Sequence, residues 1–225
     1  MDTGTALVLT SKTLQKAESL LKVVLGPPAE EFGQLWKDRV SARRFRNLVT
    51  IAVEAKEQLS RARLSPKEVP LKIIHPLLEV ASLEEDTDLQ KQWASLLANA
   101  SAGGSCSQVL PCFVDILRQL TPTEARFLDK AYNETMQPRQ DQPPNLSPPR
   151  RHTVLENTLA LLNPSMVGNL ERLGVITRHT HEIDYSTSYL GRNTMGPTNH
   201  LYIADLGMDF VRACRPPAGN PAKVE

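Results

Sequence analysis

The apolar residues of this chain recur mainly with the spacing of amphipathic helices. In the stretch from Pro66 to Ala100, five of them stand at positions i, i+4, i+7, i+8 and i+11 and draw one stripe along a helix: Leu89, Trp93, Leu96, Leu97 and Ala100. Thr87, with Gln90 three residues later, predicts a capping box where this helix begins. The stretch contains no reactive group, so its pattern predicts packing, with Trp93 as a core residue.

The same spacing, read with helix start and stop residues, predicts further helices. Before the Trp93 helix they cover residues 11–25, 28–62 and 70–81, and Pro76 either kinks the last of these or marks its true start. After it they cover residues 108–120, 122–134, 153–162, 164–173 and 205–214. Thr121 and Glu124 form a second capping box, and Gly174 occupies the position that closes a helix in a left-handed conformation.

Two short alternating segments, 177–185 and 200–203, predict strands near the C-terminal end. Three helices, a strand, a turn region, a strand and a final helix follow the order of a winged helix. We therefore expect a mainly α fold: a helical domain at 1–120, then a winged-helix-like α/β domain with a small antiparallel hairpin at 121–214. Residues 137–149 are rich in proline and predict a flexible loop, and residues 215–225 predict a disordered tail.

Composition restricts the function classes but selects none. The net charge of +1 gives no global attraction toward nucleic acid or anionic lipid, so any such attraction must be local. Three irregularly spaced cysteines without a CxxC pair favour a reduced compartment, and no apolar run has the length of a spanning helix. With no pattern of a signal peptide, we expect a cytoplasmic protein.

No enzymatic signature is present, so we predict no catalytic residue, cofactor, metal ligand or small-molecule substrate. The acidic cluster from Glu84 to Asp88 is interpreted as a helix cap. His179 and His181 share one face of a strand, with His200 on the partner strand, so a metal site is conceivable there. A solvated hairpin is the favoured interpretation.

Two groups of residues are candidate contacts for nucleic acid or a partner. In the winged-helix-like domain they are Asn169 and Arg172 on the second helix, with Arg178 and Arg192 on the strand and wing. Glu171 lies between the first two and repels phosphate, and the surface is less basic than a strong DNA binder requires. A protein-binding or structural winged helix is therefore favoured, and DNA binding stays the alternative.

The second group is the densest basic segment of the chain. Its residues cover more than one helix face: Lys37, Arg39, Arg43, Arg44 and Arg46. A solvated helix that pairs with nearby acids is the favoured interpretation, with contact to anionic lipid or nucleic acid as the alternative. The lysines and apolar face of the first helix leave open that it lies on a membrane, although packing in the core or against a second subunit is favoured.

Five segments in order carry a resemblance. They are Gly26–Gly33, Pro66–Pro70, Pro76–Glu84, Leu89–Ala100 and Phe113–Ala125, the last reading F-V-x-I-L-x-x-L-T-P-x-E-A. This order resembles the abortive infection alpha family of bacterial phage-defence proteins over about Gly26 to Cys214. Many relatives read L-T-P-L-G before the last helix, where this chain has Ile203 to Gly207, with Ala204 in place of threonine.

The resemblance implies antiphage defence of the abortive-infection type and supplies no catalytic residues. Three hypotheses follow from it and from the residues above. The first is a non-enzymatic effector that binds a protein partner or itself, the second a winged-helix DNA-binding regulator, and the third a membrane-associated effector that uses its N-terminal helices.

Overall fold

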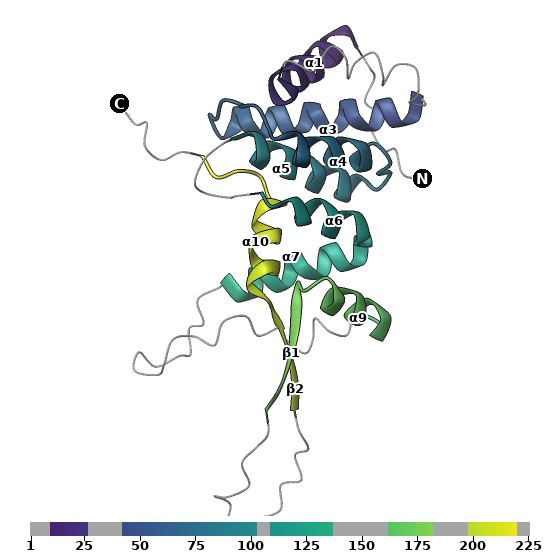
Figure 1. Cartoon of the computed structure of the whole chain (residues 1–225), viewed down its shortest axis with the longest axis vertical. Helices are drawn as coiled ribbons and strands as arrows, with labels where there is room; N and C mark the ends of the chain where they lie inside the picture. Colours follow the sequence, from purple (N-terminus) through teal and green to yellow (C-terminus); the bar gives the residue numbers. More distant parts are fainter. Residues whose placement is uncertain (1–9, 27–41, 103–108, 137–161, 182–197, 220–225) are drawn as a thin grey trace, which may run out of the picture. The chain divides into compact units, whose positions relative to one another are not determined.

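The helices form where the amphipathic pattern places them. A computed structural model describes residues 10–26, 42–102, 109–136, 162–181 and 198–219 (Figure 1). In this part of the chain the helices are α1 (Ser11–Leu25), α3 (Ala42–Arg61), α4 (Leu71–Ala81), α5 (Thr87–Ala102), α6 (Pro111–Gln119), α7 (Pro122–Met136), α9 (Pro164–Arg172) and α10 (Asp205–Ala213). The strands are β1 (Ile176–His181) and β2 (Thr198–Ile203). The prediction of a mainly helical fold with one small antiparallel strand pair is confirmed.

The chain divides into two compact units. The first unit comprises Met1–Pro122 together with Arg212–Glu225, and the second unit comprises Thr123–Val211. Residues 28–41 of the helix predicted at 28–62, the helix predicted at 153–162 apart from Leu162, and the loop predicted at 137–149 lie outside the described residues, whereas the rest of the first of these helices is α3. The expected tail begins at residue 215, and residues 215–219 are among those described.

The core of the first unit forms around α3, which packs against α1 on one side and α5 on another (Figure 1). The α5 stripe is buried as predicted: Leu89, Leu96 and Leu97 are inaccessible or nearly so, and Trp93 is 0% exposed. Ala100, the last residue of the stripe, is half-buried. Burying a large aromatic side chain typically stabilises a fold by about 1.5–3 kcal/mol, so Trp93 anchors this core, as predicted.

Two details of helix placement differ from the sequence interpretation. The cap of α5 is Asp86, one residue before Thr87, because its Oδ1 accepts hydrogen bonds from the amides of Asp88 and Leu89 at 3.0 Å. Gln90 instead donates its side-chain amide to the carbonyl of Glu84 at 2.8 Å. Pro76 lies inside α4, which begins at Leu71, so Pro76 does not mark the start of that helix.

The second unit contains α9, the strand pair and most of α7 and α10. Gly174 has φ +71° and ends α9, as predicted, because the amide of Val175 returns to the carbonyl of Leu170 at 3.2 Å. β1 and β2 pair antiparallel from Ile176 opposite Ile203 to His181 opposite Thr198. β1 begins one residue and β2 two residues before the predicted segments, and residues 182–185 of the first predicted strand lie outside the described part.

Gly207 sits at a close approach of two backbone segments within the second unit. A Cβ at this position would lie 2.1 Å from the carbonyl oxygen of Val175 and 3.0 Å from a methyl group of Ile203. The same carbonyl accepts a hydrogen bond from the amide of Ala204 at 3.0 Å. The residue at this point of the Ile203–Gly207 segment must therefore lack a side chain for α10 to begin beside β1.

Residues that follow α10 are held in the first unit by the end of the Leu89–Ala100 segment. The Nδ2 atom of Asn99, which is buried, donates to the carbonyls of Ala213 at 2.8 Å and Arg215 at 2.7 Å. These bonds satisfy carbonyls that a helix C-terminus leaves without partners inside the helix. The family-like segment therefore fixes the end of α10 as well as filling the core.

Candidate interaction surfaces

The basic segment of α3 is partly used for internal contacts. Arg43 forms an ion pair with Glu85, with 2.7 Å between Nη2 and Oε2, and both side chains are largely exposed. This contact agrees with the interpretation of a solvated helix that pairs with nearby acids. Lys37 and Arg39 lie outside the described residues. Exposed pairs of this kind contribute about 0.2–1 kcal/mol, so the Arg43 pair orients the loop after α4 more than it stabilises the fold.

Arg44 closes the end of α4. Its Nε donates to the hydroxyl of Ser82 at 2.9 Å, and its Nη2 donates to the carbonyl of Glu79 at 3.4 Å. Asn47, one turn further along α3, donates to the carbonyl of Ser82 at 3.0 Å. Because Ser82 is fully buried, the side chain of Arg44 serves the fold rather than an external ligand. Arg46 is exposed, and within the described structure its side chain makes no hydrogen bond or ion pair.

The acidic cluster after α4 caps α5, in agreement with its interpretation. The Oε1 atom of Glu84 accepts from the amides of Glu85 and Asp86 at 3.0 Å, and Asp86 caps the helix as described above. Carboxylates at a helix N-terminus also stabilise the positive end of its dipole. Each of these acids thus has a local structural role.

The predicted contact residues of α9 belong to a hydrogen-bonded chain inside the second unit. Asn169 donates through Nδ2 to Oε1 of Glu124 at 2.9 Å and accepts through Oδ1 from Nη2 of Arg172 at 2.7 Å. Glu124, which the capping-box pattern assigns to the start of α7, is only 1% exposed. The amide of Asn169 is therefore engaged through both its donor and its acceptor, and it ties α9 to α7.

Arg178 pairs with the acid that separates Asn169 from Arg172. Its Nε and Nη2 atoms lie 3.0 and 3.4 Å from the two carboxylate oxygens of Glu171. The hydrogen bond to Glu171, together with the attraction of its charge, raises the pKa of Arg178 above its ordinary value. The pair cancels much of the positive charge that the sequence suggested for this surface. Arg192 lies outside the described residues.

The three histidines considered as metal ligands lie on the strand pair. The register places His179 opposite His200 and His181 opposite Thr198, and the side chains of these residues lie outside the described part. Among the residues that are described, no group of three or more histidine, cysteine or acidic side chains has the geometry to hold a metal ion.

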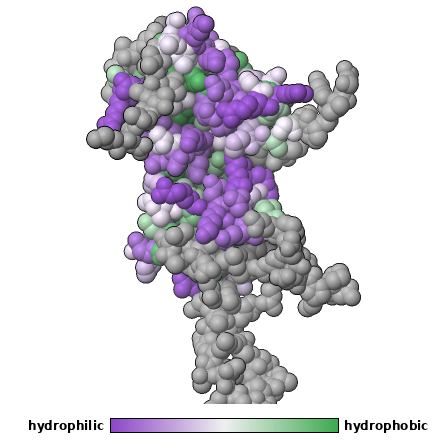
Figure 2. Space-filling view, turned by 180° about the vertical axis from the view of Figure 1, so that it is seen from behind, coloured by the Kyte–Doolittle hydropathy of each residue, from purple (hydrophilic) through white to green (hydrophobic). Residues whose placement is uncertain are grey.

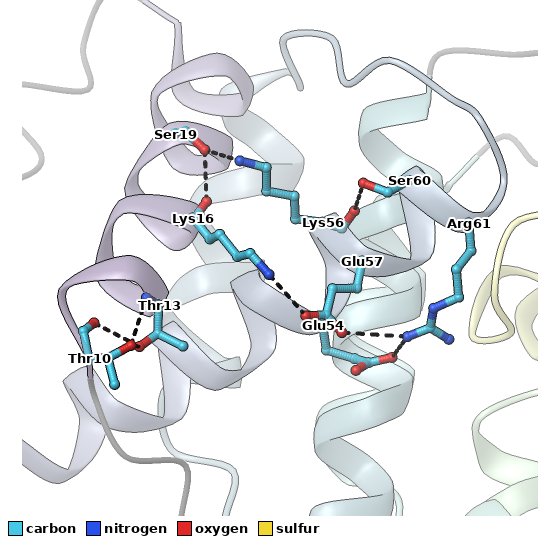
Figure 3. A network of polar contacts seen from close by, with 9 residues as sticks. All are labelled: Thr10, Thr13, Lys16, Ser19, Glu54, Lys56, Glu57, Ser60 and Arg61. Atoms are coloured by element: carbon cyan, nitrogen blue, oxygen red, sulfur yellow. Dashed lines mark hydrogen bonds and ion pairs between the residues drawn. The ribbon is translucent and has the colours of Figure 1, made fainter.

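The apolar face of α1 packs against α3. Ala17, Leu20 and Val24 are buried, and polar contacts on the rim join the two helices (Figure 3). Lys16 pairs with Glu57 at 3.5 Å, and Lys56 of α3 donates to the hydroxyl of Ser19. Packing of this helix in the core, the favoured interpretation, agrees with these contacts. No helix in the described part of the chain has the length and apolar character needed to cross a bilayer.

Sequence reasoning missed one group of exposed cations. Arg63, Lys67 and Lys72 lie on the chain between α3 and α4 and on the first turn of α4, and their side chains form no hydrogen bond or ion pair among the described residues. On the face seen in Figure 2, hydrophilic residues cover most of the described surface. The available signal was the run from residue 61 to 72, which carries four cations and one acid, Glu68.

These features define a mainly helical protein whose charged groups largely serve its own packing. The sequence matches the family described as abortive infection alpha over residues 44–214, and the chain therefore belongs to that family. The match confirms the family resemblance and includes four of the five segments that carried it, since it begins after Gly26–Gly33. Searches of curated proteins and of solved structures gave no match.

Proposed function

We propose that this protein acts in abortive-infection-type defence against phage, as a non-enzymatic effector that binds a protein partner or a second copy of itself. The observation that carries the proposal is the family match, which covers most of the chain and suggests this type of defence. The matched residues include the buried stripe of α5, the Asn99 contacts and the Glu124–Asn169 bond.

The use of polar residues supports a binding role over catalysis. Glu124, the acid most deeply buried, accepts from Asn169, and Asp86 caps α5. A catalytic acid or base needs to reach a substrate, whereas these groups serve helix contacts. Exposed cations whose side chains form no hydrogen bond or ion pair within the described residues, such as Arg63 and Lys67, remain available to a partner.

A winged-helix arrangement of the second unit remains part of this proposal. The described order of α7, α9, β1, β2 and α10 is compatible with it, and the helix predicted at 153–162 lies outside the described residues. If the unit is a winged helix, α9 takes the place of the helix that often enters the DNA major groove.

The contacts of α9 favour protein binding over reading of DNA bases. Asn169 is bonded to Glu124 and Arg172, and Arg178 is bonded to Glu171. Entry into a groove would require these bonds to exchange for bonds to bases or phosphates. A duplex titration at low salt tests this point: salt-dependent binding that Arg172→Ala and Arg178→Ala both weaken would favour the regulator hypothesis.

The packing of α1 weighs against a membrane role for this helix. Its apolar residues Ala17, Leu20 and Val24 would have to leave α3 before they entered a bilayer. Flotation with anionic liposomes tests the point, since recovery of the protein with the liposomes would favour the membrane hypothesis.

Infection assays test the defence function directly. Cells that express the chain should release fewer phage and lose viability after infection, whereas cells with an empty vector should lyse and release phage. A Gly207→Ala variant, in which α10 clashes with Val175, is the matched loss-of-fold control. Equal phage yield with and without the chain across a broad panel would contradict the proposal.

A further inference from the structure

In the described part of the first unit, the charged side chains that lack a partner are mainly positive. Of its described acids, all but Glu68 form an ion pair or a hydrogen bond. The acids concerned are Glu18, Glu54, Glu57, Glu79, Glu84, Glu85, Asp86, Asp88 and Asp115. Glu68 lies against Gly26, where its carboxylate would be within 3.0 Å of an added Cβ.

The cations without partners concentrate between α3 and α4. Arg63, Lys67 and Lys72 are exposed, and the described structure gives their side chains no hydrogen bond or ion pair. The backbone places this segment firmly, because the amide of Lys67 donates to the carbonyl of Ser101 at 2.7 Å. The three charges therefore stand on an ordered part of the unit.

Two of these cations occupy positions where they are unfavourable for the stability of the local structure. Arg63 has φ +55°, a left-handed conformation that is unfavourable for residues with a side chain. Lys72 lies in the first turn of α4, where the helix dipole disfavours positive charge and where no acidic residue is present. Residues at locally unfavourable positions are candidates for a functional role.

Exposed apolar side chains lie on the same or neighbouring elements: Leu71 precedes Lys72 in α4, and Val23 lies in the last turn of α1. Leu71 is 52% exposed and Val23 is 42% exposed. The amide of Val69 donates to the carbonyl of Val24 at 3.0 Å, which brings the end of α1 beside the start of α4. We call the surface formed by Val23, Arg63, Lys67, Leu71 and Lys72 the connector surface.

We propose that the connector surface binds an acidic segment of a partner protein that also carries aliphatic side chains. Carboxylates of the segment pair with Arg63, Lys67 and Lys72, and its aliphatic groups pack on Leu71 and Val23. Charge complementarity steers the encounter, and the apolar contact holds the bound segment. The inference rests on the proposed function, since it names the chemistry of the partner.

A protein segment fits this surface better than a nucleic acid. No aromatic residue occurs between positions 62 and 72, so the segment offers no ring on which a base could stack. Three cations also provide a small phosphate footprint compared with that of typical nucleic-acid-binding domains.

Fluorescence anisotropy with a defined probe tests the proposal on the full chain. The probe is a labelled peptide in which glutamate alternates with leucine; one comparison peptide replaces leucine with serine and another replaces glutamate with lysine. We expect the first to bind more tightly than both others, with an affinity that falls as salt rises.

Charge reversal at Arg63→Glu, Lys67→Glu and Lys72→Glu together should weaken binding of the probe by about tenfold or more. The matched control reverses three cations that also lack partners, Lys12→Glu, Arg46→Glu and Lys130→Glu, for the same change in net charge. Circular dichroism verifies that both variants fold. Equal losses in the two variants, no binding of the probe, or competition by duplex DNA at the same residues would overturn the proposal.

Arg63→Gly separates binding from stability. It relieves the left-handed backbone and removes one cation, so the probe should bind severalfold more weakly while the protein unfolds at the same or a higher temperature. If infection assays fail while the probe still binds at the connector surface, the proposed function is wrong and the surface assignment stands. If the chain confers defence but the probe does not bind, the surface assignment is wrong and the proposed function stands.

Discussion

Two helices of this protein end with the same backbone geometry but with different residues. At the end of α9 the amide of Val175 bonds to the carbonyl of Leu170, and at the end of α3 the amide of Leu64 bonds to the carbonyl of Leu59 at 2.9 Å. The left-handed residue is Gly174 in the first case and Arg63 in the second. Glycine adopts this conformation without steric cost, whereas arginine does not. Local backbone stability therefore explains the choice of residue at the end of α9 but not at the end of α3.

The end of α4 shows a third solution. Ser82 keeps a right-handed conformation, and the carbonyls near it accept hydrogen bonds from Arg44 and Asn47 of α3. Here side chains from a distant part of the sequence bind the terminal carbonyls, in place of a residue in the left-handed conformation. A basic residue near a helix end can therefore cap a neighbouring helix, as Arg44 does, or remain exposed, as Arg63 does.

The largest expected loss of stability follows from replacing Gly207, because its position leaves no room for a side chain. Gly207→Ala places a methyl group against the carbonyl of Val175, so we expect the second unit to lose on the order of 3 kcal/mol of stability. Hydrogen exchange at α9, β1 and α10 measures the loss. Gly168→Ala is the matched control, because nothing lies within 4 Å of its added Cβ and alanine favours a helix by about 0.5–1 kcal/mol. Similar behaviour of the two variants would contradict the role given to Gly207.

The next largest effect is expected from a substitution that gives the two helix ends the same residue. Gly174→Arg gives α9 the residue that α3 carries, and we expect a loss of about 1–2 kcal/mol because the backbone remains left-handed. Urea unfolding, with the second unit followed by hydrogen exchange, measures the change. An unchanged stability would show that this geometry tolerates arginine freely and would remove one argument for the connector surface.

A smaller effect compares two neighbouring arginines. Arg44→Ala removes the hydrogen bonds to Ser82 and Glu79 and should cost about 1 kcal/mol, whereas Arg43→Ala removes an exposed ion pair and should cost about 0.3 kcal/mol. Thermal unfolding of the two variants under the same conditions gives the comparison. Added salt should reduce the Arg43 effect and leave most of the Arg44 effect, and the reverse pattern would refute this assignment.

The last effect is also small, and it is the only stabilising one besides the Gly168 control: that of Arg63→Gly. Relief of the left-handed backbone and the greater freedom of glycine in the unfolded chain oppose each other, and we expect a net gain of about 0.5 kcal/mol. Urea unfolding of the first unit detects it. A clear loss of stability would mean that the Arg63 side chain contributes to the fold, which would weaken its assignment to binding.

Much of the helical framework was predictable because it depends on patterns local in the chain. The spacing of Leu89, Trp93 and Leu96 predicted a buried helix face, and Gly174 predicted the end of α9. The family resemblance was predictable from the same segments and is confirmed by the match. Helix starts were less certain: Thr87 and Asp86 are both good caps, and only the hydrogen bonds of Asp86 decide between them.

The candidate sites were less predictable because charge in a sequence does not reveal its partner. Asn169, Arg172 and Arg178 were candidate contacts for a ligand, and within the unit Asn169 bonds to Glu124, Arg172 to Asn169, and Arg178 to Glu171. The basic segment of α3 behaves in the same way, since Arg43 pairs with Glu85, more than forty positions away. The exposed cations of the connector surface drew no attention in the sequence because the run is short.

The sequence by itself determined the helices, the strand pair and the family, because periodicity, capping residues and segment order are properties of neighbouring residues. Only the tertiary structure decided which polar groups are used inside the protein and which remain exposed. It brings Asn99 to the end of α10, Arg44 to the end of α4 and Glu124 to Asn169. These contacts join residues far apart in the chain, and their formation depends on how the helices pack.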